Sequence, residues 1–281
     1  MPTVDMHQHL WPEPFLKALA RRKRPPRLTG TVLELVGERS IDIDLGAHDL
    51  ETRLALLDRS EIDVAVVSLQ PTLGIDEELG TVYERGIRDL VAASSGRLVA
   101  LAAGRAVDGF PGACVAASEL GALEAMAPRL DELERRGVFL FVHPGPAQPP
   151  DGAPDWWPAV VDYTAQMQAA YAGWLASGAQ RWPDLRVVFA ILAGGAPFQF
   201  ERLSSRGVAG RELLHENVYF ETASYGRRAL EVCLATFGVS QLCYGSDTPV
   251  IDAAPTLDAV RGFGDAVADA LCNLNPSRLL S

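Results

Sequence analysis

The 281-residue sequence contains no apolar stretch that approaches the roughly 18 residues needed to cross a membrane as a helix. Its first residues also lack the positively charged segment, followed by an apolar stretch, that marks a secretory signal. We therefore expect a cytoplasmic protein that does not associate with a membrane.

Cysteine is scarce, and the four cysteines are too scattered to form a CxxC pair. This spacing excludes a zinc ribbon and argues against a disulfide framework. We expect all four to be reduced thiols, mostly buried. They are Cys114, Cys233, Cys243 and Cys272.

Basic residues are outnumbered, with 25 Lys and Arg against 36 Asp and Glu, so the formal charge is −11. Such a chain repels nucleic acids and anionic lipids. The one basic run, residues 20–27 (ARRKRPPR), has no interleaved aromatic residues and is interpreted as a solvated helix end. The expected partner is a small-molecule substrate, and a homodimer is left open.

Short apolar runs recur along the chain, and most are followed by a segment with helical spacing. Such continuous runs are typical of parallel strands covered on both faces. The eight runs are residues 3–8, 63–69, 97–103, 112–118, 137–143, 185–191, 217–223 and 241–247. They predict a single α/β domain over residues 1–281, a (β/α)8 TIM-type barrel.

An open, doubly wound sheet is the alternative fold. It usually carries a glycine-rich phosphate-binding turn after the first strand, where this chain has HLWPEP. Residues 31–46 (TVLELVGERSIDIDLG) do not fit the βα alternation and predict a β-hairpin turning around Gly37-Glu38. Inserted after the first strand, this hairpin would lie over the barrel mouth.

Two histidines close the first predicted strand, in VDMHQHL. Side chains alternate along a strand, so His7 and His9 share one face. His143 ends the fifth strand in FLFVHPG, and Asp247 ends the eighth in CYGSDTP. Taken alone, His143 could be a core histidine and Asp247 a helix N-cap. Together, four ligand-type residues at strand ends predict a site for one divalent metal, with zinc favoured and Mn²⁺, Fe²⁺ or Co²⁺ open.

With these three motifs in this order, the sequence resembles the amidohydrolase superfamily. It looks most like the branch of amino-carboxymuconate-semialdehyde decarboxylase and its amidohydrolase-related relatives. The resemblance extends to RVVFAILAGGAPF at 186–198 and NPSRLL at 275–280. It implies a distorted (β/α)8 barrel in which His7, His9, His143 and Asp247 bind one divalent metal, usually zinc.

The sequence departs from this family after the sixth strand. Where the family usually carries a histidine that acts as an acid or base, this chain reads ILAGG. The position falls on Leu192, or on Ile191 if the register shifts by one. Of the other histidines, His215 is expected at the opposite end of the barrel. His48 could overhang the barrel mouth but is expected in a polar loop, so neither is assigned a catalytic role.

The first functional hypothesis is a metal-dependent hydrolase that acts on a small organic substrate through a metal-activated water, with Asp247 as the proton acceptor. The alternatives are a non-oxidative decarboxylase (carboxy-lyase) of the same superfamily, and a metal-binding barrel that has lost turnover. For decarboxylation, Glu221 is the candidate acid, although it could equally pair with Arg227 or Arg228.

Further residues near the predicted strand ends are candidates for contacting the substrate. Trp11 follows the two histidines, and an aromatic ring there could line a pocket or simply pack between loop and helix. Ser224, Tyr225 and Arg227 follow the seventh strand and could bind a polar or carboxylate group.

Overall fold

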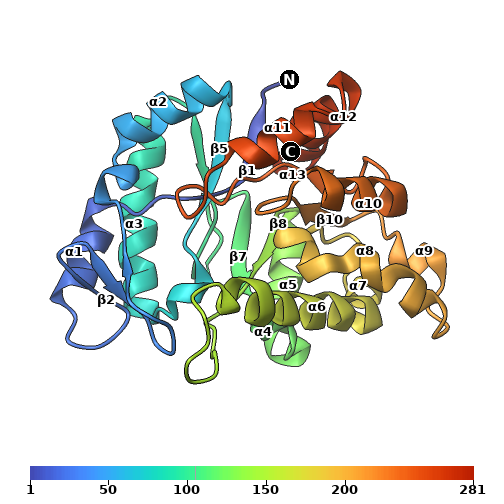
Figure 1. Cartoon of the computed structure of the whole chain (residues 1–281), viewed down its shortest axis with the longest axis horizontal. Coiled ribbons are helices and arrows are strands. Elements are labelled where there is room, and N and C mark those ends of the chain that lie inside the picture. Colours follow the sequence, from blue (N-terminus) through green and yellow to red (C-terminus); the bar gives the residue numbers. More distant parts are fainter. Residues whose placement is uncertain (105) are drawn as a thin grey trace.

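The computed structural model describes residues 1–104 and 106–281, without the side chains of Arg211 and Glu212. Strands lie in the middle of the molecule with helices around them (Figure 1). Each of the eight predicted runs overlaps a strand. These are β1 (Val4–His9), β5 (Val64–Ser68), β6 (Leu98–Ala100), β7 (Gly112–Ala116), β8 (Phe139–His143), β9 (Val187–Phe189), β10 (Val218–Glu221) and β11 (Leu242–Cys243).

These strands pair in parallel in two sheets, with the orders β1-β5-β6 and β11-β10-β9-β8-β7. Isolated bridges join the two sheets on both sides, from Gln8 to Thr248 and from Ala102 to Ala113. The strands therefore follow the circular order of a (β/α)8 barrel, although not as one continuous sheet. The predicted fold class is confirmed, and the open-sheet alternative is wrong because both edges are joined.

Helices and short turns connect the strands. In chain order they are α1 (Glu13–Arg21), η1 (Leu45–His48), α2 (Leu50–Ser60), η2 (Pro71–Leu73), α3 (Glu77–Ala93), α4 (Ala117–Leu120), α5 (Leu123–Arg136), η3 (Pro158–Asp162), α6 (Tyr163–Gly173), η4 (Trp174–Gly178), α7 (Ala179–Arg181), α8 (Ile191–Ser204), α9 (Gly210–Leu213), α10 (Arg227–Phe237), α11 (Ala254–Arg261), α12 (Asp265–Asp269), η5 (Ala270–Leu274) and α13 (Asn275–Leu280). None of the described helices combines the length and the apolar character that a membrane crossing requires.

The insertion after β1 is a three-stranded antiparallel sheet of β2 (Arg27–Thr29), β3 (Val32–Glu34) and β4 (Ile41–Asp42). The pair β3–β4 is the hairpin expected within residues 31–46. Strand β2 was not predicted, because it begins at Arg27, the last residue of the basic run, and its three residues show no alternation of their own. Leu28 and Leu33 are buried and anchor this sheet to the body of the protein.

Candidate metal centre

The two histidines of β1 point to the same side of the strand, as their spacing predicts. His7 and His9 are almost completely buried, and the Nε2 atoms of their rings are 3.2 Å apart. The ring of His7 packs edge-on against Phe141 of β8, with centroids 5.1 Å apart. The face they share is therefore the interior of the barrel.

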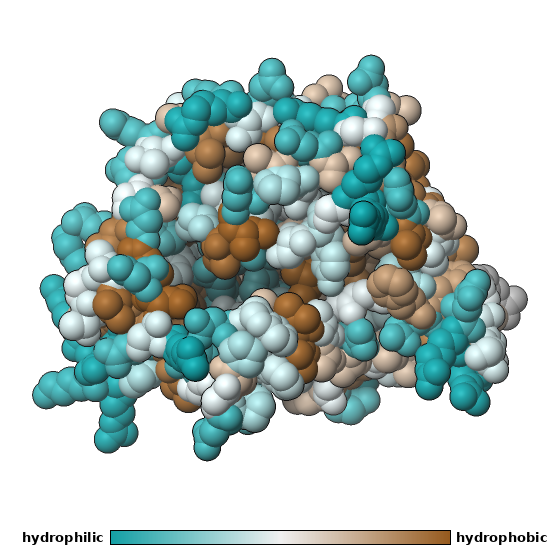
Figure 2. Space-filling model, viewed as in Figure 1, coloured by the Kyte–Doolittle hydropathy of each residue, from teal (hydrophilic) through white to brown (hydrophobic). Residues whose placement is uncertain are grey.

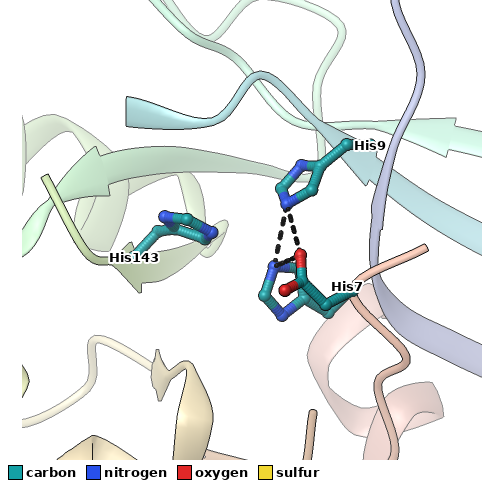
Figure 3. A group of neighbouring side chains, drawn as sticks. His7, His9 and His143 are labelled. Atoms are coloured by element: carbon teal, nitrogen blue, oxygen red, sulfur yellow. Dashed lines mark hydrogen bonds and ion pairs between the residues drawn. The ribbon is translucent and has the colours of Figure 1, made fainter. Parts of the chain in front are cut away.

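The ends of β8 and β11 lie close together, so His143, the last residue of β8, and Asp247, in the turn after β11, join the two histidines of β1. One donor atom from each of His7, His9, His143 and Asp247 lies within 4.8 Å of every other. Figure 3 shows the three imidazole rings turned toward one another. Asp247 has a φ of 61°, a conformation that costs a non-glycine residue about 1 kcal/mol or more and is often retained at functional sites. The four residues predicted as ligands are thus brought together.

The hydrogen bonds around this cluster fix the ring protons. Nδ1 of His9 lies 3.0 Å from the carbonyl of Ser68, and Nδ1 of His143 lies 2.9 Å from the carbonyl of Pro144. A carbonyl only accepts, so each Nδ1 carries the proton and each neutral ring turns an Nε2 lone pair to the centre. Nε2 of His9 and Oδ1 of Asp247 are 3.0 Å apart. Two lone pairs at this distance require a cation or a proton between them, so the donor set fits a divalent cation.

The pKa values agree with this distribution of protons. Burial lowers the pKa of His9 and holds that of His143 well below its usual value, so both rings are neutral. Burial also lowers the pKa of His7, but the charge and hydrogen bond of Glu221 outweigh it and raise the pKa to about 9. Before a cation binds, His7 therefore holds a second proton at the centre of the cluster, and a bound cation would displace it.

Glu221 lies behind His7, not on the cavity wall. Its Oε2 accepts a hydrogen bond from Nδ1 of His7 at 2.8 Å and one from the backbone N–H of Ile191 at 3.2 Å, and its Oε1 accepts one from Ala223. The side chain is fully buried. The structure therefore corrects both predictions for this residue: Glu221 neither reaches a substrate as an acid nor pairs with an arginine, but orients His7.

Replacement of Glu221 by glutamine should weaken metal binding. The glutamine oxygen can still accept from His7, but its NH2 group then faces a backbone N–H that needs an acceptor. We expect the metal affinity to fall about 10- to 100-fold and the free energy of unfolding to fall by about 1–3 kcal/mol. Competition with a chromogenic chelator measures the first and urea denaturation the second. Unchanged affinity would show that Glu221 does not act through His7.

A cavity of about 640 Å³ opens above the cluster. His7, His143 and Asp247 line it at one end, and residues of the β2–β4 insertion, among them Leu33 and Ile41, line it elsewhere. On the face seen in Figure 2, hydrophobic residues gather around a hollow near the centre. Of the described residues that line the cavity, none is lysine or arginine.

The predicted substrate-contacting residues divide into two groups. Trp11, Ser224 and Tyr225 line the cavity. Arg227 does not: its guanidinium forms an ion pair with Glu231 at 3.0 Å and stacks on Phe263. Its assignment as a substrate-binding residue is therefore corrected, because the side chain is committed on the outer surface of α10.

The position of the missing histidine after β9 is occupied by an apolar side chain. Ile191 lines the cavity, whereas Leu192 is buried away from it, so the shifted register is the one that the structure adopts. The backbone from Ile191 to Gly195 runs through five successive residues with positive φ, three of them non-glycine. No spacing rule in the sequence predicts such a left-handed turn.

The hydrogen bonds and ring stacking around Trp11 were not predicted from the sequence. Its backbone N–H donates to Nδ1 of His48 at 3.1 Å, and its indole N–H donates to Oε1 of Gln70 at 2.7 Å. The Trp11 and His48 rings stack with centroids 4.5 Å apart and planes 7° apart. His48 was expected in a polar loop, but it is only 7% exposed and lines the cavity. A histidine at the end of the insertion does not by itself predict this position, because the contact with Trp11 forms only when the chain folds.

His48 should make the stability of the protein depend on pH. Burial, with the charge of the nearby Arg53 guanidinium, lowers the pKa of folded His48 to about 3, against about 6.5 in the unfolded chain. Its contribution is therefore complete above pH 6.5 and is lost as the pH falls, by about 2 kcal/mol between pH 7 and pH 5. His48→Asn, which keeps an acceptor for Trp11, should lose less stability over this interval than the wild type.

Urea denaturation of chelator-treated protein at pH 7 and pH 5 measures this difference. The chelator removes the contribution of metal binding, which also depends on pH. Equal losses in the two proteins would show that His48 is protonated as readily in the folded state as in the unfolded state.

The fold and the site define a parallel-stranded α/β barrel with a buried His-His-His-Asp cluster at the carboxyl ends of its strands, the place where barrel enzymes carry their active sites. The chain belongs to the amidohydrolase family, whose model matches residues 4–281. The predicted family, and with it the prediction of an enzyme, are confirmed.

Several solved structures share this fold. The apo IDCase of Metarhizium anisopliae is 22% identical, with a TM-score of 0.79, and the match covers 99% of this chain and 97% of that one. The 2,6-dihydroxybenzoate decarboxylase from Rhizobium is 17% identical, with a TM-score of 0.73 and coverage of 100% and 98%. A 5-carboxyvanillate decarboxylase from Novosphingobium aromaticivorans, complexed with manganese, is 16% identical, with a TM-score of 0.76 and coverage of 100% and 96%. A search of the curated proteins gave no match. At these identities, the likeness concerns the fold.

Proposed function

We propose that this protein is a metal-dependent decarboxylase that releases carbon dioxide from a small carboxylic acid. The observation that carries the proposal is the His-Asp cluster at one end of a largely apolar cavity. Two of the similar structures are named as decarboxylases of aromatic acids, which favours this reaction over the hydrolysis considered first.

In this proposal, His7, His9, His143 and Asp247 hold one divalent cation. When bound, the cation supplies a positive charge and a Lewis acid to the carboxylate of the substrate. Zinc suits three imidazoles and one carboxylate. Manganese is the second candidate, because the similar 5-carboxyvanillate decarboxylase is complexed with it.

The residues of the chain itself supply a largely apolar cavity and a group that moves a proton. Loss of carbon dioxide leaves an electron pair on carbon, which must take up a proton. Asp247 belongs to the cluster and also lines the cavity, so we assign it the relay of this proton from a water molecule to the carbon. Leu33, Ile41 and Ile191 form an apolar wall of the cavity. Burial against this wall disfavours the charged carboxylate of the substrate.

Hydrolysis is the second candidate, favoured by Ile191. With an apolar side chain after β9, no imidazole from this strand can act as an acid, whereas hydrolysis needs only a proton acceptor such as Asp247.

A single panel separates the two reactions. Protein loaded with zinc or with manganese is incubated with aromatic and unsaturated acids, and carbon dioxide is measured; esters, lactones and amides are tested in parallel. We expect carbon dioxide from at least one acid and none with Asp247→Asn. Turnover of esters, lactones or amides alone would make the protein a hydrolase. No turnover with one full equivalent of metal would favour a barrel that has lost catalysis.

A further inference from the structure

Trp11 joins the insertion to the rim of the barrel at the cavity wall through its backbone N–H and its indole N–H. Its two N–H groups reach His48, at the end of η1, and Gln70, just after β5. Each of these partners is 7% exposed, and each lines the cavity together with Trp11. Segments from three distant parts of the sequence thus form one wall.

The direction of these two hydrogen bonds decides what the wall offers to a ligand. A backbone N–H and an indole N–H can only donate, so Nδ1 of His48 and Oε1 of Gln70 must accept. The proton of neutral His48 is then on Nε2, and the amide NH2 of Gln70 is turned away from Trp11. Within the described part of the chain, neither nitrogen has a hydrogen-bond partner.

The charges around the cavity limit what these donors can bind. Glu38, Asp42 and Asp44 of the insertion also line the cavity, and no described lysine or arginine does. A second anionic group on the substrate would meet these carboxylates without a compensating cation. A neutral acceptor oxygen meets no such penalty, and two N–H donors satisfy it.

We propose that His48 and Gln70 form a neutral two-donor subsite for an uncharged oxygen of the substrate, such as a hydroxyl, ether or carbonyl oxygen. This inference rests on the proposed function, in which the metal cluster receives the carboxylate. The substrate class is then an oxygen-substituted monocarboxylic acid, and dicarboxylic acids are disfavoured. Trp11 acts as a positioning residue. Its hydrogen bonds to Nδ1 of His48 and Oε1 of Gln70 hold these acceptor atoms away from the cavity and leave the N–H groups of both side chains for the substrate.

Binding of simple probes to the metal-loaded protein tests the subsite without turnover. The probes are benzoate, its hydroxy-, methoxy- and acetyl-substituted forms at each ring position, and isophthalate as a dicarboxylate. Calorimetry at pH 7.5 should show at least one oxygen-substituted benzoate binding about tenfold more tightly than benzoate. Isophthalate should bind no more tightly than benzoate. Equal binding of benzoate and all of its substituted forms would overturn the proposal.

Isosteric variants assign the preference to the two residues. Gln70→Glu keeps the acceptor for the indole of Trp11 but replaces the free donor by an acceptor, and should abolish the tenfold preference. His48→Asn keeps an acceptor for the backbone of Trp11 and removes the Nε2 donor, and should reduce the preference several-fold. Thr72→Val, a change at another lining residue, should retain it. If Gln70→Glu fails to fold, His48→Asn decides, and retention of the full preference in the folded variants would refute the subsite.

The two proposals fail separately. A preference for oxygen-substituted acids without release of carbon dioxide would leave the subsite intact and refute decarboxylation. Release of carbon dioxide with no preference for oxygen-substituted acids would support decarboxylation and refute the subsite.

Discussion

Replacement of His143 by alanine is expected to empty the metal centre and abolish activity. His143 supplies one of the four clustered donors, and its other ring nitrogen donates to the neutral carbonyl of Pro144. Its loss therefore removes a donor without stranding a buried charge, unlike the loss of His7, which would leave the buried carboxylate of Glu221 without its charged partner. We expect less than about a tenth of an equivalent of metal after dialysis, and kcat/KM lower by about 10³-fold or more.

The loss of metal should also appear as lost stability. A cation at 1,000 times its dissociation constant stabilises the folded state by about 4 kcal/mol, so added zinc or manganese should raise the Tm of the wild type but not of His143→Ala. The control is His215→Ala, at a histidine that precedes β10 at the amino ends of the strands. Metal content and activity in this control should match the wild type. Full metal occupancy in His143→Ala would mean that the cluster is not the metal site.

The ligand cluster could be predicted because it depends on local geometry. The alternation of a strand placed His7 and His9 on one face, and parallel strands of a barrel bring their carboxyl ends to one mouth. His143 is the last residue of β8, whereas Asp247, predicted to end the eighth strand, lies four residues beyond the end of β11 at the same mouth. The prediction of the cluster does not depend on how the strands pair. It therefore holds although β11 is only two residues long and shorter than the predicted run.

The surroundings of the cluster depend on contacts that no local pattern encodes. Glu221 acts through His7, which is 214 residues away in the sequence, and the wall of Trp11, His48 and Gln70 comes from three separate segments. Arg227 was misplaced because a residue just after a strand can begin a helix and point outward, as it does at the start of α10. The left-handed turn after β9 likewise shifts the position on the cavity wall from Leu192 to Ile191.

Replacement of Gly245 by alanine is expected to disrupt the metal centre from behind. Gly245 lies two residues before Asp247, and a Cβ added there would overlap Oε1 of Glu221 and lie 2.6 Å from Cβ of His7. Neither neighbour can move freely, because Glu221 is bound to His7 and to backbone N–H groups inside the barrel. We expect the free energy of unfolding to fall by about 3 kcal/mol, and the metal affinity to fall by about 10- to 100-fold as His7 loses its orientation.

Gly226→Ala is the matched control, because a Cβ there meets no atom within 4 Å and the backbone φ of −101° suits alanine. Because Gly226 is the N-cap of α10, where alanine is less favourable than glycine, this change should lower the free energy of unfolding by no more than about 1 kcal/mol and leave metal binding unchanged. Urea denaturation and chelator competition measure both variants. If Gly245→Ala kept the stability and metal affinity of the wild type, Glu221 and His7 could move apart without weakening the site. The hydrogen bond between them would then not be what orients the metal ligands.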